Sequence, residues 1–261
     1  MASPINRFSP LIFLLFLLYT QCAPLNAQSP EDTEVWQPVP PVTDPAGPHF
    51  TPPPADAIVL FDGTSADEWV SARNGEPAEW ILEDRVLTVQ PGSGDIETKR
   101  SFGDIQLHLE FRAPAEISGQ GQGRGNSGIF LQQRYEIQVL DNWENPTYVN
   151  GMTGSIYKQH IPLANPGRKP GEWQSYDIFY SAPRFDEQDR LIKPARVTVL
   201  LNGILIQNNV EIFGNTVYIG EPSYEAHGPL PIRLQDHGNL VSYRNVWLRE
   251  AERLVSESTA R

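Results

Sequence analysis

The stretch from Tyr135 to Asp141, YEIQVLD, combines strand-forming residues with three polar side chains that could do acid–base chemistry. On a regular strand Glu136 and Gln138 point to the same side, whereas Asp141 points to the other. One β-bulge after Gln138 would bring Asp141 beside them, and bulges often lie next to active sites. Glu136 and Asp141 could then flank a sugar bond as acid and base, or as acid and nucleophile. The alternative interpretation is an ordinary solvated strand face.

A second polar cluster lies in PIRLQDHGNL, where Arg233 and Gln235 share one face of a predicted strand. Asp236 and His237 follow in a turn. Imidazole titrates near neutral pH, so His237 could take or give a proton. Asp236 could contact a substrate, or it could only shape the turn through its own backbone.

Further candidates for substrate binding lie in three segments. The glycine-rich stretch GQGQGRGNSGIF is predicted to be a mobile loop that carries Arg124 and Asn126 to the edge of a groove, or else a plain flexible loop. Trp143 could stack on a sugar or close the end of the fold. The polar run at a predicted strand end consists of Lys158, Gln159 and His160.

Several classes of chemistry and partner find no support in the sequence. It contains no Ser-His-Asp elbow, no cysteine within the predicted domain and no His-rich metal motif. A calcium site built from carboxylates is an open alternative without diagnostic spacing. The formal charge of -12 argues against nucleic acid and anionic membranes as partners.

The rest of the chain predicts an all-β fold. The 24 Pro and 20 Gly indicate many turns and few long helices. Many short runs alternate with period two; in DIQLHLEFR the residues Ile105, Leu107, Leu109 and Phe111 share one face. Asn202-Gly203 predicts a hairpin with a type I′ turn. This order of strands and turns predicts a sandwich of two antiparallel sheets.

The ends of the chain predict targeting and a linker. Residues 1–27 resemble a signal peptide with the apolar run LIFLLFLLY, which is too short for a membrane span. We therefore expect export to the periplasm or the exterior, with lipid anchoring through Cys22 as the alternative, and no transmembrane span in the mature chain. Residues 28–55 form a Pro-rich linker or arm, 56–250 the sandwich domain, and 251–261 a polar tail.

The chain resembles the bacterial 3-keto-disaccharide hydrolase domain family from about Asp56 to Glu250. The motifs that carry the resemblance are LFDGTSADEWV, NSGIFLQ, YEIQVLD, GSIYKQHIPLANPGRKPGEWQSYDIFYSAPRFD, PARVTVLLNGILIQNNVEI and HGPLPIRLQDHGNLVSYRNVWLRE. The resemblance implies a concanavalin A-like jelly-roll sandwich, export, and a carbohydrate substrate oxidised beforehand by a separate sugar 3-oxidoreductase. The positions that match the family's polar motifs are Glu136, Gln138, Asp141, Lys158, Gln159, Arg233, Gln235, Asp236 and His237.

Two reaction routes fit these residues. A ketone at C3 acidifies the hydrogen on C2, so a base can remove it, the C1 substituent can leave, and water can add back. His237 or Glu136 could be the base and Asp141 or Glu136 the acid, with Lys158 or Arg233 holding the enolate oxygen. Direct hydrolysis would use two carboxylates. A different class, the non-catalytic carbohydrate-binding module, would use the same fold.

Overall fold

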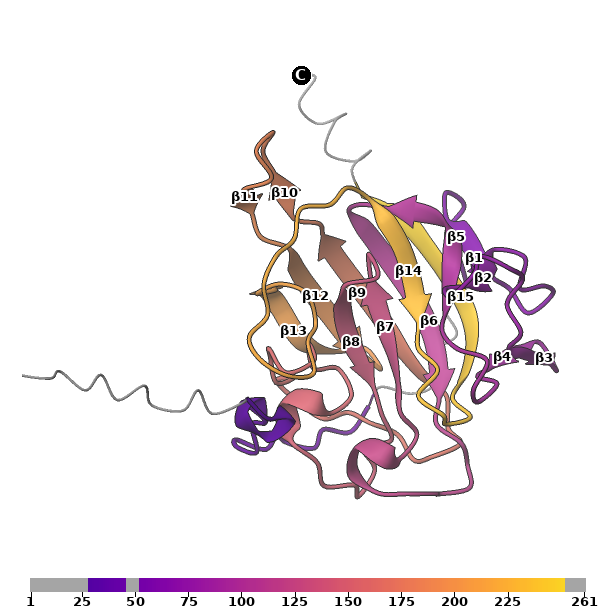
Figure 1. Cartoon of the computed structure of the whole chain (residues 1–261). Helices are drawn as coiled ribbons and strands as arrows, with labels where there is room; N and C mark the ends of the chain where they lie inside the picture. The colour runs from indigo at the N-terminus through magenta and orange to yellow at the C-terminus, as the bar shows by residue number, and fades with distance from the viewer. Residues whose placement is uncertain (1–27, 46–51, 252–261) are drawn as a thin grey trace, which may run out of the picture.

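The computed structural model describes residues 28–45 and 52–251, which form a sandwich of two antiparallel sheets (Figure 1). The larger sheet has eight strands in the order β13-β12-β9-β6-β15-β4-β3, and β1 pairs with β15 beside this path. The smaller sheet has five strands in the order β2-β5-β14-β7-β8. The predicted all-β sandwich is therefore confirmed.

The elements are short and are joined mainly by turns and loops. The larger sheet comprises β1 (Ile58–Phe61), β3 (Ile81–Glu83), β4 (Val86–Thr88), β6 (Ile105–Arg112), β9 (Gln174–Ser181), β12 (Arg196–Leu201), β13 (Ile204–Glu211) and β15 (Ser242–Glu250). The smaller sheet comprises β2 (Trp69–Ser71), β5 (Ile96–Phe102), β7 (Ser127–Leu131), β8 (Tyr135–Val139) and β14 (Leu230–Leu234). A separate ladder pairs β10 (Arg184–Phe185) with β11 (Leu191–Lys193). Short 3-10 turns within the described ranges are η1 (Pro30–Thr33), η2 (Gly121–Gly123) and η3 (Val149–Gly151).

The core lies between the two sheets, and alternation along the strands fills it. Ile129 and Ile137 of the smaller sheet and Tyr176 of the larger sheet are fully or almost fully buried. The Tyr176 hydroxyl donates to the Gln138 carbonyl oxygen at 2.8 Å, so a hydrogen bond also joins the sheets. The alternation predicted for β6 agrees with the buried residues Ile105, Leu107, Leu109 and Phe111.

The other face of β6 is also buried, although its residues are polar. His108 is 0% exposed, and its Nδ1 atom lies 2.7 Å from Asp177 Oδ1. Glu110 accepts hydrogen bonds from Arg244 Nε at 2.6 Å and from Asn245 Nδ2 at 2.9 Å. These contacts pair charged groups on the outer face of the larger sheet, whereas the cavity described below opens on the smaller sheet.

The predicted hairpin between β12 and β13 is confirmed. Leu201 pairs with Ile204 across a two-residue turn. Asn202 and Gly203 both have positive φ angles, 52° and 78°, as a type I′ turn requires. The Asn202 side chain accepts a hydrogen bond from Ser175 N at 3.0 Å, so the turn is also tied to the start of β9.

The Pro-rich segment, where described, lies against the domain as an arm. The side-chain amide of Asn150 in η3 makes two hydrogen bonds to this segment. Its oxygen accepts from Val35 N and its nitrogen donates to the Thr33 carbonyl oxygen, both at 2.9 Å. Val42 forms a parallel bridge with Asn165. Figure 1 shows this indigo segment at the edge of the sandwich near η3. We refer to residues 28–45 as the arm.

Two expectations concern residues that the structure does not describe. The signal peptide with Cys22 and nearly all of the polar tail lie outside the described residues. Within 28–45 and 52–251, no helix has the length and apolar character needed to cross a membrane.

Candidate active site

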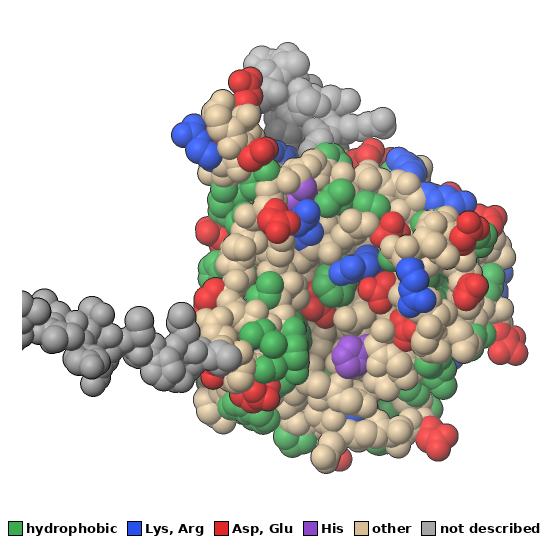
Figure 2. Space-filling view, viewed as in Figure 1, with side chains coloured by type: hydrophobic (Ala, Val, Ile, Leu, Met, Phe, Trp, Pro, Cys, Tyr) green, Lys and Arg blue, Asp and Glu red, His purple; other side chains and the backbone are tan. Residues whose placement is uncertain are grey.

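A cavity of about 660 Å³ opens on the outer face of the smaller sheet, where β8 ends near the turn after β14. Figure 2 shows this face hollowed beside a histidine side chain, with hydrophobic side chains across the hollow. Its volume falls in the range of small-molecule sites. The lining residues are Glu34, Gln122, Gly123, Asn126, Phe130, Glu136, Gln138, Tyr148, Tyr157, Thr216, Tyr218, Gln235 and His237.

Glu136 is the buried acid of this cavity. It lies on β8 opposite Phe130 of β7, and only 5% of the residue is exposed. Burial raises its pKa to about 8, against the opposing pull of the Arg233 charge, and Asp95 adds to the rise. At neutral pH the carboxyl therefore carries a proton that it can donate.

Gln138 can accommodate either protonation state of Glu136. In one orientation of its amide, Nε2 donates to Gln122 Oε1 at 3.0 Å. With the amide turned over, the nitrogen donates instead to Glu136 Oε1 at 2.9 Å, which suits an ionised carboxylate. In the first orientation the amide oxygen occupies that position, where a protonated Glu136 can donate to it.

Gly128 provides the space that the Glu136 carboxyl occupies. It pairs with Gln138 across the β7–β8 ladder. A Cβ atom at this position would lie 2.6 Å from Glu136 Oε1 and 3.1 Å from Phe130 Cε2. Glycine at this position of β7 therefore leaves room for the Glu136 carboxyl group on the outer face of the smaller sheet.

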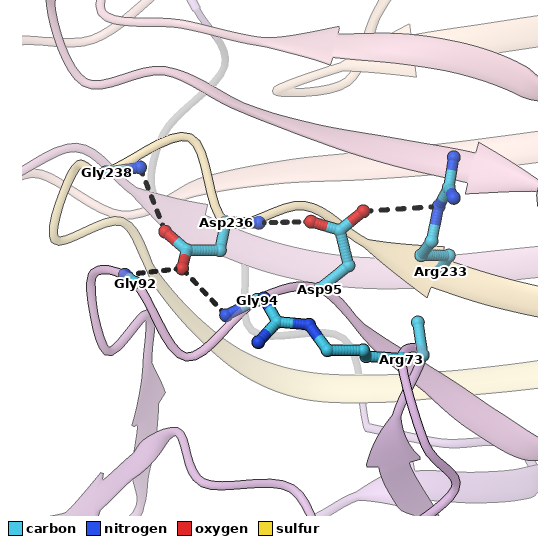
Figure 3. Close-up of a pocket in the computed structure, with 8 residues that line it drawn as sticks. Arg73, Gly92, Gly94, Asp95, Arg233, Asp236 and Gly238 are labelled. Atoms are coloured by element: carbon cyan, nitrogen blue, oxygen red, sulfur yellow. Dashed lines mark hydrogen bonds and ion pairs between the residues drawn. The ribbon is translucent and has the colours of Figure 1, made fainter.

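His237 reaches the same cavity from the turn after β14, and it is exposed. Asp236 builds that turn: its carboxylate accepts from Gly92 N at 2.7 Å, Gly94 N at 3.0 Å and Gly238 N at 2.9 Å (Figure 3). The structure therefore brings His237 and Glu136 to one cavity, while Asp236 has the turn-shaping role.

Arg233 lines a neighbouring cavity of about 600 Å³ rather than the one that holds Glu136. Its Nε atom lies 3.5 Å from Asp95 Oδ2 (Figure 3). Its guanidinium carbon lies 4.2 Å from the centre of the Phe130 ring, which itself lines the Glu136 cavity. Arg233 thus lies behind Phe130, outside the lining of the cavity, and its charge lowers the pKa of Glu136 from there.

Asp141 is not beside Glu136. The β7–β8 ladder pairs every residue from Ser127↔Val139 to Leu131↔Tyr135, so the bulge that would have turned Asp141 towards the cavity is not present there. Asp141 is 3% exposed and accepts from Arg124 Nε at 2.6 Å. Arg124 also donates to the Trp143 carbonyl oxygen at 2.8 Å. This buried pair anchors the glycine-rich loop, which in turn places Gln122 and Asn126 on the cavity.

We expect Asp141→Asn to lower the free energy of unfolding by on the order of 3 kcal/mol, because it leaves the buried Arg124 unpaired. Urea denaturation measures this directly. The surface pair Asp186–Arg190 provides the control, and Asp186→Asn should lower the free energy of unfolding much less than Asp141→Asn, because solvent screens this pair. Loss of turnover with unchanged stability in Asp141→Asn would contradict the structural role.

The run after the SIY motif also lies outside the Glu136 cavity. The Lys158 ammonium donates to the Pro30 carbonyl oxygen at 2.5 Å and to the Tyr218 carbonyl oxygen at 3.0 Å. Gln159 donates to the Gly214 carbonyl oxygen at 3.1 Å. His160 and Trp143, which the sequence also predicts to contact substrate, do not line the Glu136 cavity either. The His160 ring is hydrogen-bonded to the Glu211 carbonyl oxygen at 2.6 Å, and the Trp143 ring centre lies 5.4 Å from the Lys169 ammonium.

The cavity is also lined by tyrosine and threonine side chains that the sequence motifs do not predict as a group. Tyr148 and Tyr157 join their hydroxyls at 2.7 Å, and burial raises the pKa of both, that of Tyr148 to about 12. Tyr157 lies in the SIY motif and Gln122 in the glycine-rich loop, so both are close in sequence to residues that the motifs predict to bind substrate. Tyr148, Thr216 and Tyr218 come from segments without a recognisable pattern, and only the fold brings them together.

A metal site would need several His, Cys, Asp or Glu side chains close together. Within the described ranges, no three His, Cys, Asp or Glu side chains are grouped in a way that could hold a metal ion.

The chain belongs to a family whose model is described as the 3-keto-alpha-glucoside-1,2-lyase-like domain and matches residues 56–249. A solved structure of a candidate glycosyl hydrolase from Parabacteroides distasonis is 51% identical, covers 84% of this chain and 95% of its own, and superposes with a TM-score of 0.76. A search of curated proteins found no match.

Two further candidate glycosyl hydrolases from the same organism share the fold. One is 20% identical with a TM-score of 0.54, over 74% of this chain and 93% of its own. The other is 22% identical with a TM-score of 0.52, over 74% of this chain and 98% of its own. These two structures support the fold alone, whereas the family match and the 51% identical structure support a carbohydrate-related role of the glycosyl hydrolase type.

Proposed function

We propose that this protein cleaves the glycosidic bond of a 3-keto glycoside or disaccharide by elimination followed by addition of water. Glu136 acts as the general acid and His237 as the general base. The observation that carries the proposal is that a buried carboxyl, protonated at neutral pH, and an exposed imidazole line one cavity of about 660 Å³.

In the first step His237 removes the proton from C2, which the C3 ketone has acidified, and an enolate forms at C2, C3 and the ketone oxygen. The C1–O bond then breaks, a C1–C2 double bond forms, and Glu136 protonates the departing oxygen. In the second step water adds to C1 and gives a proton to ionised Glu136, while His237 returns a proton to C2. Both residues end in their starting states.

The enolate oxygen needs a donor, and the tyrosine pair can supply it. The hydroxyls of Tyr148 and Tyr157 share one hydrogen bond, which leaves one of their two protons to donate into the cavity. Lys158 and Arg233, the two cations expected from the sequence, do not line this cavity. We therefore assign this role to the tyrosine pair.

Direct hydrolysis would need a second carboxylate beside the sugar bond. Asp141, the expected partner, is committed to Arg124. The other carboxylate of the cavity, Glu34, belongs to the arm, where Trp36 Nε1 donates to it, and we assign it to substrate binding, so elimination is the route that we propose. The exposed ring of Tyr218 would suit a non-catalytic binding module instead, as a surface on which a sugar stacks. Binding of the intact glycoside without product would favour the module.

The proposed substrate requires an earlier oxidation at C3, which we assign to a separate sugar 3-oxidoreductase. We propose that the protein meets its substrate after export directed by residues 1–27. The test of the function is incubation with matched pairs of glycosides that differ only at C3, ketone against hydroxyl, with and without a chelator. Release of the sugar from the ketone alone supports the proposal, whereas release from both, or from neither, contradicts it.

A further inference from the structure

The arm supplies one wall of the candidate active site from outside the family domain. Glu34 lines the cavity, although the family match begins at residue 56. Its Oε2 atom accepts from Trp36 Nε1 at 3.3 Å, and the Trp36 ring meets the edge of Tyr148, another lining residue, with 6.2 Å between centroids. A residue of the arm is thus part of the site.

The arm is also tied to the opposite wall through Lys158. Its ammonium donates to the Pro30 carbonyl oxygen of the arm and to the Tyr218 carbonyl oxygen of the loop after β13. It lies 4.8 Å from the Tyr218 ring centre and 5.6 Å from that of Tyr148. These contacts hold the arm against the domain, with the Lys158 ammonium beside the two rings and outside the described lining of the cavity.

The charge of the cavity follows from these contacts. Among the described residues that line it, none is Lys or Arg, and the two acids are Glu34 and Glu136. Lys158 is engaged by carbonyl oxygens and Arg233 by Asp95, both outside the lining. A ligand therefore meets amides, hydroxyls, aromatic rings, the His237 imidazole, the Glu136 carboxyl group and the Glu34 carboxylate, but no Lys or Arg side chain among the described lining residues.

We propose that Glu34 is a specificity-determining residue, which makes the cavity select glycosides with a neutral second sugar over those with an anionic one. This inference rests on the proposed function, because it assigns the reacting sugar to Glu136 and His237 and the second sugar to the arm wall. A carboxylate on that second sugar would face Glu34 across a cavity whose described lining contains no Lys or Arg side chain to offset the repulsion, and like charges at close range repel strongly.

The test compares two 3-keto disaccharides, one with glucose and one with glucuronate as the second sugar, on the full chain. We expect Glu34→Gln to raise the ratio of kcat/KM for the glucuronate substrate to that for the glucose substrate by about tenfold, and Glu34→Lys to raise it further. Glu31→Gln is the matched control, because it removes the same charge from an exposed position of the arm that does not line the cavity. Equal ratios in Glu34→Gln and Glu31→Gln would overturn the proposal, as would an equal loss of turnover on both substrates in Glu34→Gln.

Binding of the corresponding unoxidised disaccharides separates this inference from the proposed function. Calorimetry should show that Glu34→Gln strengthens binding of the glucuronate disaccharide relative to the glucose disaccharide, even if neither is cleaved. Selective binding without any cleavage of 3-keto substrates would reject the proposed function and keep the role of Glu34. Cleavage with no change in selectivity would do the reverse.

Discussion

Replacement of Glu136 by glutamine is expected to lower kcat/KM on a 3-keto glycoside by about 10²–10⁴-fold, because the departing oxygen loses its proton donor. Gln has nearly the same shape and can keep the contact with Gln138, so substrate binding should change much less than turnover. Steady-state kinetics on wild type and variant measure the effect. Unchanged turnover would remove Glu136 from the mechanism.

The same substitution should make the protein more stable at neutral pH. The folded chain keeps the Glu136 proton up to a pH of about 8, whereas the unfolded chain releases it around its ordinary pKa of 4.5. Stability is therefore fully present below that lower value and is lost as pH rises towards 8. The Glu136→Gln variant has no proton to lose at this position. Its free energy of unfolding at pH 7 should therefore exceed that of wild type by on the order of 3 kcal/mol.

Denaturation at a series of pH values tests this directly. The difference between the two proteins should be smallest near pH 4 and should grow up to about pH 8. A constant difference across this range would show that Glu136 is not held neutral, and the acid role would then lose its physical basis. Glu97→Gln on β5, a less buried carboxyl outside the cavity, provides the control variant.

Replacement of His237 by alanine is expected to lower kcat by about 10²–10⁴-fold with little change in KM, because proton removal from C2 loses its base. The side chain is exposed and its turn is held by Asp236, so the fold should be unaffected. Added imidazole should restore part of the rate, since the space left open faces the cavity.

His160→Ala serves as the control for this prediction. His160 was also expected to contact substrate, but its ring lies 4.7 Å from the Phe213 ring centre and it does not line the cavity. Its replacement should leave kcat within about threefold of wild type, well below the effect of a lost acid or base. A rise in KM alone for His237→Ala, without loss of kcat, would reduce His237 to a binding contact.

Local patterns of the sequence predicted the elements that local physics determines. Alternation identified β6, and Asn202-Gly203 identified the hairpin between β12 and β13, because both signals depend on neighbours in the chain. The spacing of Glu136 and Gln138 also placed both side chains on one face of β8. The convergence of this strand with the β14 turn was an inference from two separate motifs, and the shared cavity of Glu136 and His237 agrees with it.

The details that escaped prediction depend on contacts between distant segments. The side to which Asp141 turns depends on whether the ladder contains a bulge, and the bulge assumed from spacing is absent from the register. The role of Lys158 depends on the arm, whose Pro-rich composition gave no sign that its carbonyl oxygens would meet an ammonium group. The tyrosines of the cavity come from two connections, β8–β9 and β13–β14, which only the complete sandwich brings together.

The measurement that tests the account most directly is cleavage of a 3-keto glycoside in D₂O, with the released sugar analysed by NMR or mass spectrometry. Elimination transfers the C2 hydrogen to His237, which is exposed and exchanges it with solvent before a proton returns to C2, so we predict deuterium at C2 in the product. A control with the product sugar and no protein corrects for spontaneous exchange. Release of a sugar that retains its original hydrogen at C2 would contradict the mechanism and point to direct hydrolysis.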